Sequence, residues 1–321
     1  MVPQEGVEWL DAVLQMRKRR IEVIEKLEKI RDSTIFVFWN LDELQRDDFV
    51  TLADVLEEEN PTNNIDLVVV SPGGNGEAGY RIGHTFQQWA VRKNLSFRVI
   101  IPLYAKSAAT ILSLGAHELV MGVHSEIGPI DLQIARFDKK TGRWRYIPSM
   151  AVMDGLKLVG EYIGRLPIMS SFFQEILGKE QLSLEELGVL ERGRESGKQY
   201  GELLLQGGML ADPETARHTV ERLSDYYKHH GHPIDAFDAE QDLHLKVQHS
   251  NGSEWAAIKE LRDQFQAFVG QPGIIPGAMV TSVVECARLR SWRYLPLEPP
   301  GPGRHLMVLP ESGSVRDYSN E

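Results

Sequence analysis

The amino-acid sequence predicts an α/β fold, with a core of βαβ units around a largely parallel sheet and a mainly helical C-terminal half. Short, almost continuously apolar runs at 35–39, 65–70 and 97–102 are typical of strands that are covered on both faces. The segments between these runs repeat apolar residues at helical spacing. Strands that alternate with helices in this way form right-handed βαβ units, so most neighbouring strands should run parallel.

The first predicted element is a charged amphipathic helix. Between residues 9 and 30, apolar side chains recur at helical spacing with arginine, lysine and glutamate between them. This pattern predicts a helix that packs on the core of its own chain, and a contact between subunits is the alternative. Two further helices are predicted after the first two strands, at 47–59 and 76–91.

The alternation of helices and strands continues beyond the third strand. Residues 108–114 are small and apolar, which favours a buried helix, and residues 118–121 resemble a fourth short strand. The polar stretch 139–145 predicts a turn that joins two strands or forms an exposed hairpin.

After residue 148 the helical pattern dominates. It predicts helices at 183–190, 213–229 and 253–269. Asp212 and Pro213 fit the cap and first-turn positions of the second of these helices. The proline-rich stretch after Tyr294 predicts an extended or partly disordered end.

Length and charge narrow the class of protein. The 321 residues are 42% apolar, which is enough to bury a large core. We expect an N-terminal helix at 1–31, a core at 32–252, and a C-terminal helix with a Pro-rich tail at 253–321. A formal net charge of −11 argues against nucleic acid as a partner.

The cysteine content and the length of the apolar runs indicate the cellular compartment of the protein and whether it binds a metal or another cofactor. The single cysteine, Cys286, excludes an intramolecular disulfide and a multi-thiolate metal site, and it suits a reducing compartment such as the cytoplasm. The sequence shows neither a signal-peptide run nor the roughly 18 uninterrupted apolar residues that would span a bilayer. The HHGH cluster alone is a weak metal signature, so we predict no metal and no other cofactor.

A glycine pair follows the second predicted strand. Residues 68–79 read VVVSPGGNGEAG, so the strand stops at Ser71-Pro72, and Gly73 and Gly74 precede a helix. Glycine lets the main chain turn its N–H groups toward a cavity, where such amides stabilise an oxyanion. A phosphate loop and a simple tight turn are the alternatives, although a Walker loop would end in Gly-Lys-Ser/Thr.

Ser107 lies where the third strand gives way to a helix of small residues. Residues 102–115 read PLYAKSAATILSLG. A serine at a helix start lies at the positive end of the backbone dipole, and the neighbouring alanines leave room for a substrate carbonyl. The pattern taken alone is also typical of a helix N-cap.

Three motifs in order resemble a known family. SPGG follows one strand, YAKSAAT follows the next, and SEIGPIDLQ comes third. Over residues 65–133 this order resembles the serine dehydrogenase proteinase family, the relatives of signal peptide peptidase A, with a weaker echo at 230–247. The resemblance implies the Clp protease/crotonase fold, Ser107 as nucleophile, and an oxyanion hole formed by Gly73 and Gly74.

A serine hydroxyl needs a base within hydrogen-bond reach, usually histidine or a lysine of depressed pKa. His230 matches the histidine of the family's His-x-x-Pro-Ile segment, and a solvated His-rich loop is the alternative. Asp131 in GPID would orient a base or organise the substrate strand, or else cap a turn. Lys157 is a further candidate base or a surface lysine, and Lys106 should project away from the nucleophile.

The sequence departs from commoner relatives of signal peptide peptidase A. Lys106 precedes the serine, Ala108 and Ala109 stand where glycines often follow it, and the charged helix replaces a membrane segment. We expect a hydrolase: a cytoplasmic, homo-oligomeric serine peptidase that cleaves peptides or proteins through a Ser107 acyl-enzyme. An inactive binding or scaffold protein and a crotonase-type acyl-CoA enzyme are the alternatives.

Overall fold

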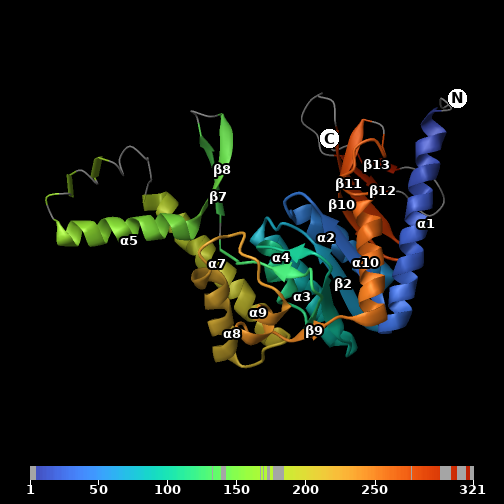
Figure 1. The fold of residues 1–321 in the computed structure, drawn as a ribbon, viewed down its shortest axis with the longest axis horizontal. Coiled ribbons are helices and arrows are strands. Elements are labelled where there is room, and N and C mark those ends of the chain that lie inside the picture. Colours follow the sequence, from blue (N-terminus) through green and yellow to red (C-terminus); the bar gives the residue numbers. More distant parts are fainter. Residues whose placement is uncertain are drawn as a thin grey trace.

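A large sheet runs through the centre of the molecule in the computed structural model (Figure 1). The structure describes residues 5–131, 133–138, 142–166, 168, 170–171, 174–175, 184–275, 277–296, 305–308 and 316–318. Within these residues the sheet has nine strands, in the order β13-β12-β11-β10-β1-β2-β3-β5-β9. The strands are β1 (Ser33–Asn40), β2 (Asn64–Val70), β3 (Phe97–Ile101), β5 (Glu118–Met121), β9 (Val247–His249), β10 (Ala278–Glu285), β11 (Arg290–Pro296), β12 (His305–Val308) and β13 (Arg316–Tyr318).

The half of the sheet from β1 to β9 is parallel. From Ile65 to Val70 every residue of β2 is buried, because helices cover both faces of the sheet. The connecting helices are α2 (Arg46–Glu59), α3 (Gly76–Lys93) and α4 (Ala108–Ser113). The α/β fold with parallel βαβ units predicted from the sequence is confirmed.

Helices α1 (Glu5–Arg31) and α10 (Gly252–Gln266) lie side by side on one face of the sheet (Figure 1). Val13, Ile24 and Leu27 of α1 are fully buried there against β1 and α10. The predicted packing of the N-terminal helix on its own core is confirmed. None of the described helices is both long enough and apolar enough to cross a membrane.

The other half of the sheet is antiparallel and is formed late in the chain. Strand β10 pairs antiparallel with β1, and β11 to β13 extend the sheet from there. The sequence pattern did not predict β10 and β11. Part of the segment after Tyr294 is strand, whereas its proline-rich stretch 297–304 falls outside the described residues.

The predicted hairpin is present as β7 (Gln133–Asp138) and β8 (Arg143–Pro148). It leads into α5 (Ser149–Arg165), and both project from the body of the molecule (Figure 1). Helix α7 (Leu184–Gly207) packs against α3 and α4. The remaining short elements are β4 (Tyr104–Ala105), β6 (Glu126–Ile127), α8 (Pro213–Glu221), the π-helical turn η2 (Arg222–Tyr226) and α9 (Ala236–Gln241). Asp212 caps α8 as predicted, and the helix predicted to reach 229 ends at Tyr226.

Candidate active site

Ser107 stands in a strained turn between β4 and α4. Its φ of 51° and ψ of −116° lie in a region that non-glycine residues rarely adopt, and such strain concentrates at functional sites. Ser107 occupies the N-cap position of α4, but its side chain makes no capping hydrogen bond. Helix capping therefore does not account for this serine, and its half-buried hydroxyl remains available for chemistry.

The glycine loop after β2 packs directly on the serine turn. Gly73 has φ 94°, and a Cβ on it would lie 2.5 Å from the carbonyl oxygen of Lys106 and 2.7 Å from Ser107 Cβ. Gly74 has φ 147°, and its Cβ would lie 2.5 Å from the backbone nitrogen of Leu44. Only glycine fits either position, since each needs a positive φ and a backbone approach that leaves no room for a side chain.

Gly73, Gly74 and Ala108 line the same cavity as Ser107, so the partners of their backbone N–H groups matter. The Gly73 N–H donates to Ser71 Oγ at 3.1 Å. In the part of the chain that the structure describes, the N–H groups of Gly74 and Ala108 donate to no other protein group. The Ala108 N–H was not among the donors predicted from the sequence, although a residue that begins a helix has an N–H without a partner inside that helix.

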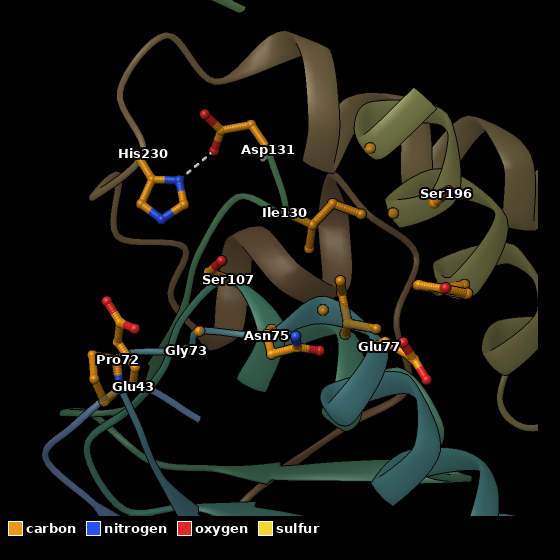
Figure 2. Close-up of a pocket in the computed structure, with 17 residues that line it drawn as sticks. Glu43, Pro72, Gly73, Asn75, Glu77, Ser107, Ile130, Asp131, Ser196 and His230 are labelled. Carbon is orange, nitrogen blue, oxygen red and sulfur yellow. Dashed lines mark hydrogen bonds and ion pairs between the residues drawn. The ribbon is translucent and has the colours of Figure 1, made fainter. Parts of the chain in front are cut away.

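His230 and Asp131 form a pair at the same cavity. His230 Nδ1 lies 2.5 Å from Asp131 Oδ1, and the side chains are 20% and 6% exposed. If Nδ1–H donates to the carboxylate, the second ring nitrogen carries the lone pair and can accept a proton. Figure 2 shows that nitrogen directed away from Asp131, on the side of the ring where Ser107 lies.

The two lysines considered in the sequence analysis lie elsewhere. Lys157 is exposed on α5, which projects away from the body, and it does not line the cavity (Figure 1). Lys106 Nζ is turned away from the serine, because it pairs with Glu126 at 2.8 Å and donates to the carbonyl oxygen of Ile127 at 3.1 Å. Of the candidate bases, only His230 lines the cavity beside Ser107.

A cavity of about 560 Å³ brings the predicted site residues together (Figure 2). All five line it: Gly73, Gly74, Ser107, Asp131 and His230. They come from four chain segments, at residues 73–74, 107, 131 and 230, and the first two of these follow the carboxyl ends of β2 and β3, which is where α/β sheets usually bind ligands. The sequence analysis had placed them in one site only through the order of its motifs.

Helix α7 supplies a wall of the cavity that the sequence did not reveal. Gly193, Ser196, Gly197 and Tyr200 line it from this helix. Their four- and three-residue spacings are ordinary for one helix face, so they carry no signal of a site. The acidic side chains of Glu43 and Glu77 line the cavity as well.

Ion pairs hold the α7 wall to the π-helical turn that precedes His230. Asp225 of this turn lies 3.1 Å from Arg194 and 2.8 Å from Lys198, both on α7. Burial acts to raise the pKa of Asp225, but hydrogen bonds from Lys198 and Ser224 and the charges of Lys198 and Arg194 lower it overall. Asp225 therefore remains ionised and joins α7 to the turn that precedes His230.

The fold and the site define a class: an α/β protein with a strained serine, a histidine–aspartate pair and unpartnered backbone amides at one cavity. Residues 10–141 match the model of a family described as ClpP-like SDH-type serine proteinase. This match confirms the family resemblance predicted from the sequence, and it includes the serine turn, the glycine loop and Asp131. The matched family is one of serine proteinases.

Two archaeal relatives also match this chain. Both are uncharacterized proteins of Methanocaldococcus jannaschii. MJ0137 is 22% identical over 210 residues, which are 62% of this chain and 69% of the relative. MJ1495 is 24% identical over 149 residues, so the match spans 46% of this chain and about half, 46%, of that relative.

Solved structures with similar chains include two proteases. The 1510-N membrane-bound stomatin-specific protease is 14% identical, with a TM-score of 0.37, over 76% of this chain and 86% of that chain. A second structure of that protease, in complex with a substrate peptide, is 15% identical over 67% and 74% of the two chains, also with a TM-score of 0.37. ClpP1 from Listeria monocytogenes is 12% identical, with a TM-score of 0.36, over 71% of this chain and 96% of that chain.

Proposed function

We propose that this protein is a serine peptidase with Ser107 as its nucleophile, His230 as its general base and Asp131 as the group that orients His230. One observation carries the proposal. A serine with positive φ and no capping bond shares a cavity with a histidine that is already paired to a buried carboxylate. This is the set of roles that activates a weak hydroxyl nucleophile at neutral pH.

The proposed reaction passes through an acyl-enzyme. Ser107 Oγ attacks the carbonyl carbon of a peptide bond while its proton moves to the free nitrogen of His230. When the tetrahedral intermediate collapses, the carbon–nitrogen bond breaks and the leaving amine takes that proton. Water then attacks the ester with His230 as base, which releases the carboxylic acid and regenerates the serine.

Backbone amides would stabilise the oxyanion of each tetrahedral intermediate. Gly73 and Gly74 are the donors that the sequence analysis named, and the N–H of Ala108 lies beside them on the serine turn. Gly74 and Ala108 are free to donate, whereas Gly73 would first have to release its hydrogen bond to Ser71. Preorganised donors of this kind contribute without reorganising during the reaction.

Labelling of the active serine tests the proposal. A fluorophosphonate probe should label the wild-type protein at Ser107, as located by mass spectrometry of the digested adduct. Ser107→Ala should abolish labelling and lower kcat for peptide cleavage by about a thousandfold or more. Ser196→Ala, which removes another serine from the same cavity, is the matched control and should label normally.

Two outcomes would contradict a serine peptidase. A folded wild-type protein that neither reacts with the probe nor cleaves any peptide would favour a binding or scaffold protein. Turnover of a CoA thioester that survives Ser107→Ala would favour a crotonase-type enzyme, in which amides alone polarise the carbonyl. The cytoplasmic location and the homo-oligomer remain predictions, which cell fractionation and light scattering of the purified protein would check.

A further inference from the structure

Lys106 precedes Ser107 in the chain, yet its side chain serves a different part of the molecule. Its ammonium group forms an ion pair with Glu126 Oε1 at 2.8 Å and donates hydrogen bonds to the carbonyl oxygens of Ile127 at 3.1 Å and of His232 at 3.4 Å. The side chain is only 14% exposed. One carboxylate and two carbonyl oxygens therefore surround the ammonium charge.

The path of the Lys106 side chain is shaped by Gly128. A Cβ on Gly128 would lie 2.7 Å from Lys106 Cδ, so the glycine leaves the space that the lysine stem fills. Thr110 also links the serine turn to Gly128. Thr110 Oγ1 lies 2.8 Å from the carbonyl oxygen of Ala105 and 2.9 Å from that of Gly128, and it accepts from the Gly128 N–H at 3.1 Å.

The acceptors of Lys106 belong to the two segments that carry the histidine–aspartate pair. Ile127 and Gly128 lead into Asp131, and His232 follows His230 by two residues. These segments also bond to each other, because Ile127 and Ile234 exchange backbone hydrogen bonds at 2.9 and 3.1 Å. The Lys106 ammonium group therefore lies where the segments of Ser107, Asp131 and His230 meet.

We infer that Lys106 is a positioning residue: it holds the serine turn in register with the segments that bear Asp131 and His230. The inference rests on the proposed serine peptidase function. A charged donor makes stronger hydrogen bonds to carbonyl oxygens than a neutral one, particularly where water is largely excluded. Lys106 immediately precedes Ser107 in the chain, so a shift of the Lys106 side chain moves Ser107 relative to His230.

The test is a Lys106→Met substitution, which removes the ammonium charge and keeps an unbranched side chain. Lys106→Met should lower the rate of fluorophosphonate labelling at Ser107 by about 10- to 100-fold, the loss expected when reacting groups are misplaced by about 1 Å. The same variant should lower kcat for a cleaved peptide while KM changes little, because Lys106 does not line the cavity. Lys106→Arg, which keeps the charge and the donors, should recover part of the lost rate.

Lys93→Met is the matched control. Lys93 also ties two segments together, through Asn60 and the carbonyl oxygen of Pro61 at 3.1 Å, but it lies at the end of α3 away from the cavity. The Lys93→Met variant should be less stable than wild type, but the fluorophosphonate probe should label Ser107 of its folded fraction at the wild-type rate. Equal slowing in both lysine variants, or wild-type labelling in Lys106→Met, would overturn the inference while leaving the peptidase proposal intact.

Hydrogen exchange keeps the inference testable even if the wild-type protein does not react with the probe. Failure of wild type to react counts against the peptidase. In that case Lys106→Met should still increase amide exchange at Ile127 and Ile234, the two residues that join the segments of Asp131 and His230. Unchanged exchange at these amides would overturn the positioning role by itself.

Discussion

Three buried carboxylates of this protein differ in the partners they are given. Asp66, on β2 under α1, receives two guanidinium groups at 2.5 Å, from Arg31 and Arg98, and a hydrogen bond from Ser33. Asp48, at the start of α2, pairs with one guanidinium group, that of Arg293 at 2.6 Å, and accepts a hydrogen bond from the Gln45 N–H at 2.7 Å. Asp131 has a histidine, whose second nitrogen remains open to the cavity.

The partner of a buried carboxylate decides whether that carboxylate can serve stability or catalysis. A carboxylate whose partners are arginines has no partner that can accept a proton, because guanidinium groups stay charged. Removing the carboxylate from such a buried set leaves uncompensated positive charge. A carboxylate paired with histidine leaves a group that can gain or lose a proton. Stability should therefore depend most on Asp66, and catalysis on Asp131.

The largest effect is expected at the histidine–aspartate pair. Asp131→Asn should lower kcat for peptide cleavage by about a thousandfold, because the amide no longer favours the tautomer that leaves the outer nitrogen free. The free energy of unfolding in urea should fall by only about 2 kcal/mol, since one hydrogen bond to an ionised group is weakened. A variant that is equally slow to cleave and strongly destabilised would show that Asp131 is structural, as Asp66 is.

The complementary change is at Asp66. Asp66→Asn should lower the free energy of unfolding by about 3 kcal/mol, because it leaves two cations without their shared carboxylate, one of them fully buried. Labelling of Ser107 in the folded fraction should be unchanged. If Asp66→Asn does not fold, Arg98→Met, which removes only the more exposed cation, should give a smaller loss in the same measurement.

The smallest effect is expected at Asp48. Burial raises the pKa of this carboxyl from 3.8 to about 6, although the charge of Arg293 opposes the rise. A raised pKa in the folded state means that this group favours folding below pH 3.8 and loses that contribution as the pH rises through 6. Lowering the pH from 7 to 5 should therefore add about 1 kcal/mol of stability from Asp48.

Urea unfolding at pH 7 and pH 5 measures this contribution. The shift between the two curves should be larger in the wild-type protein than in Asp48→Asn, because the asparagine cannot titrate. Identical shifts in the two proteins would mean that burial does not raise the pKa of Asp48 in the folded protein.

The parallel half of the fold could be predicted because its signals are local. The apolar runs of β1, β2 and β3 and the amphipathic pattern of α3 each lie within one element. Strands β10 and β11 were missed because the evidence for them is distant: β10 becomes a strand of this sheet by pairing with β1, more than 200 residues away.

The residues of the site also differ in whether a local sequence pattern could predict them. Gly73, Gly74 and Ser107 stand at strand ends, where sequence patterns already indicate unusual backbone. His230 and Asp131 could be paired only through the family resemblance, since nothing local joins residues 99 positions apart. The α7 wall and the three partners of Lys106 could not be predicted, because the side-chain directions are set by packing between distant segments.

Because the serine turn depends on distant segments, the order of synthesis affects when the site can form. Ser107 is made early on the ribosome and its strained backbone is supported by the Gly73 loop, but the His230–Asp131 pair and the hydrogen bond from Lys106 to His232 form only when residues near 230 have emerged. Translation therefore delivers the proposed nucleophile well before the groups that complete its surroundings. An incomplete chain carries the serine as an ordinary alcohol, and the site exists only once most of the domain has been synthesised and folded.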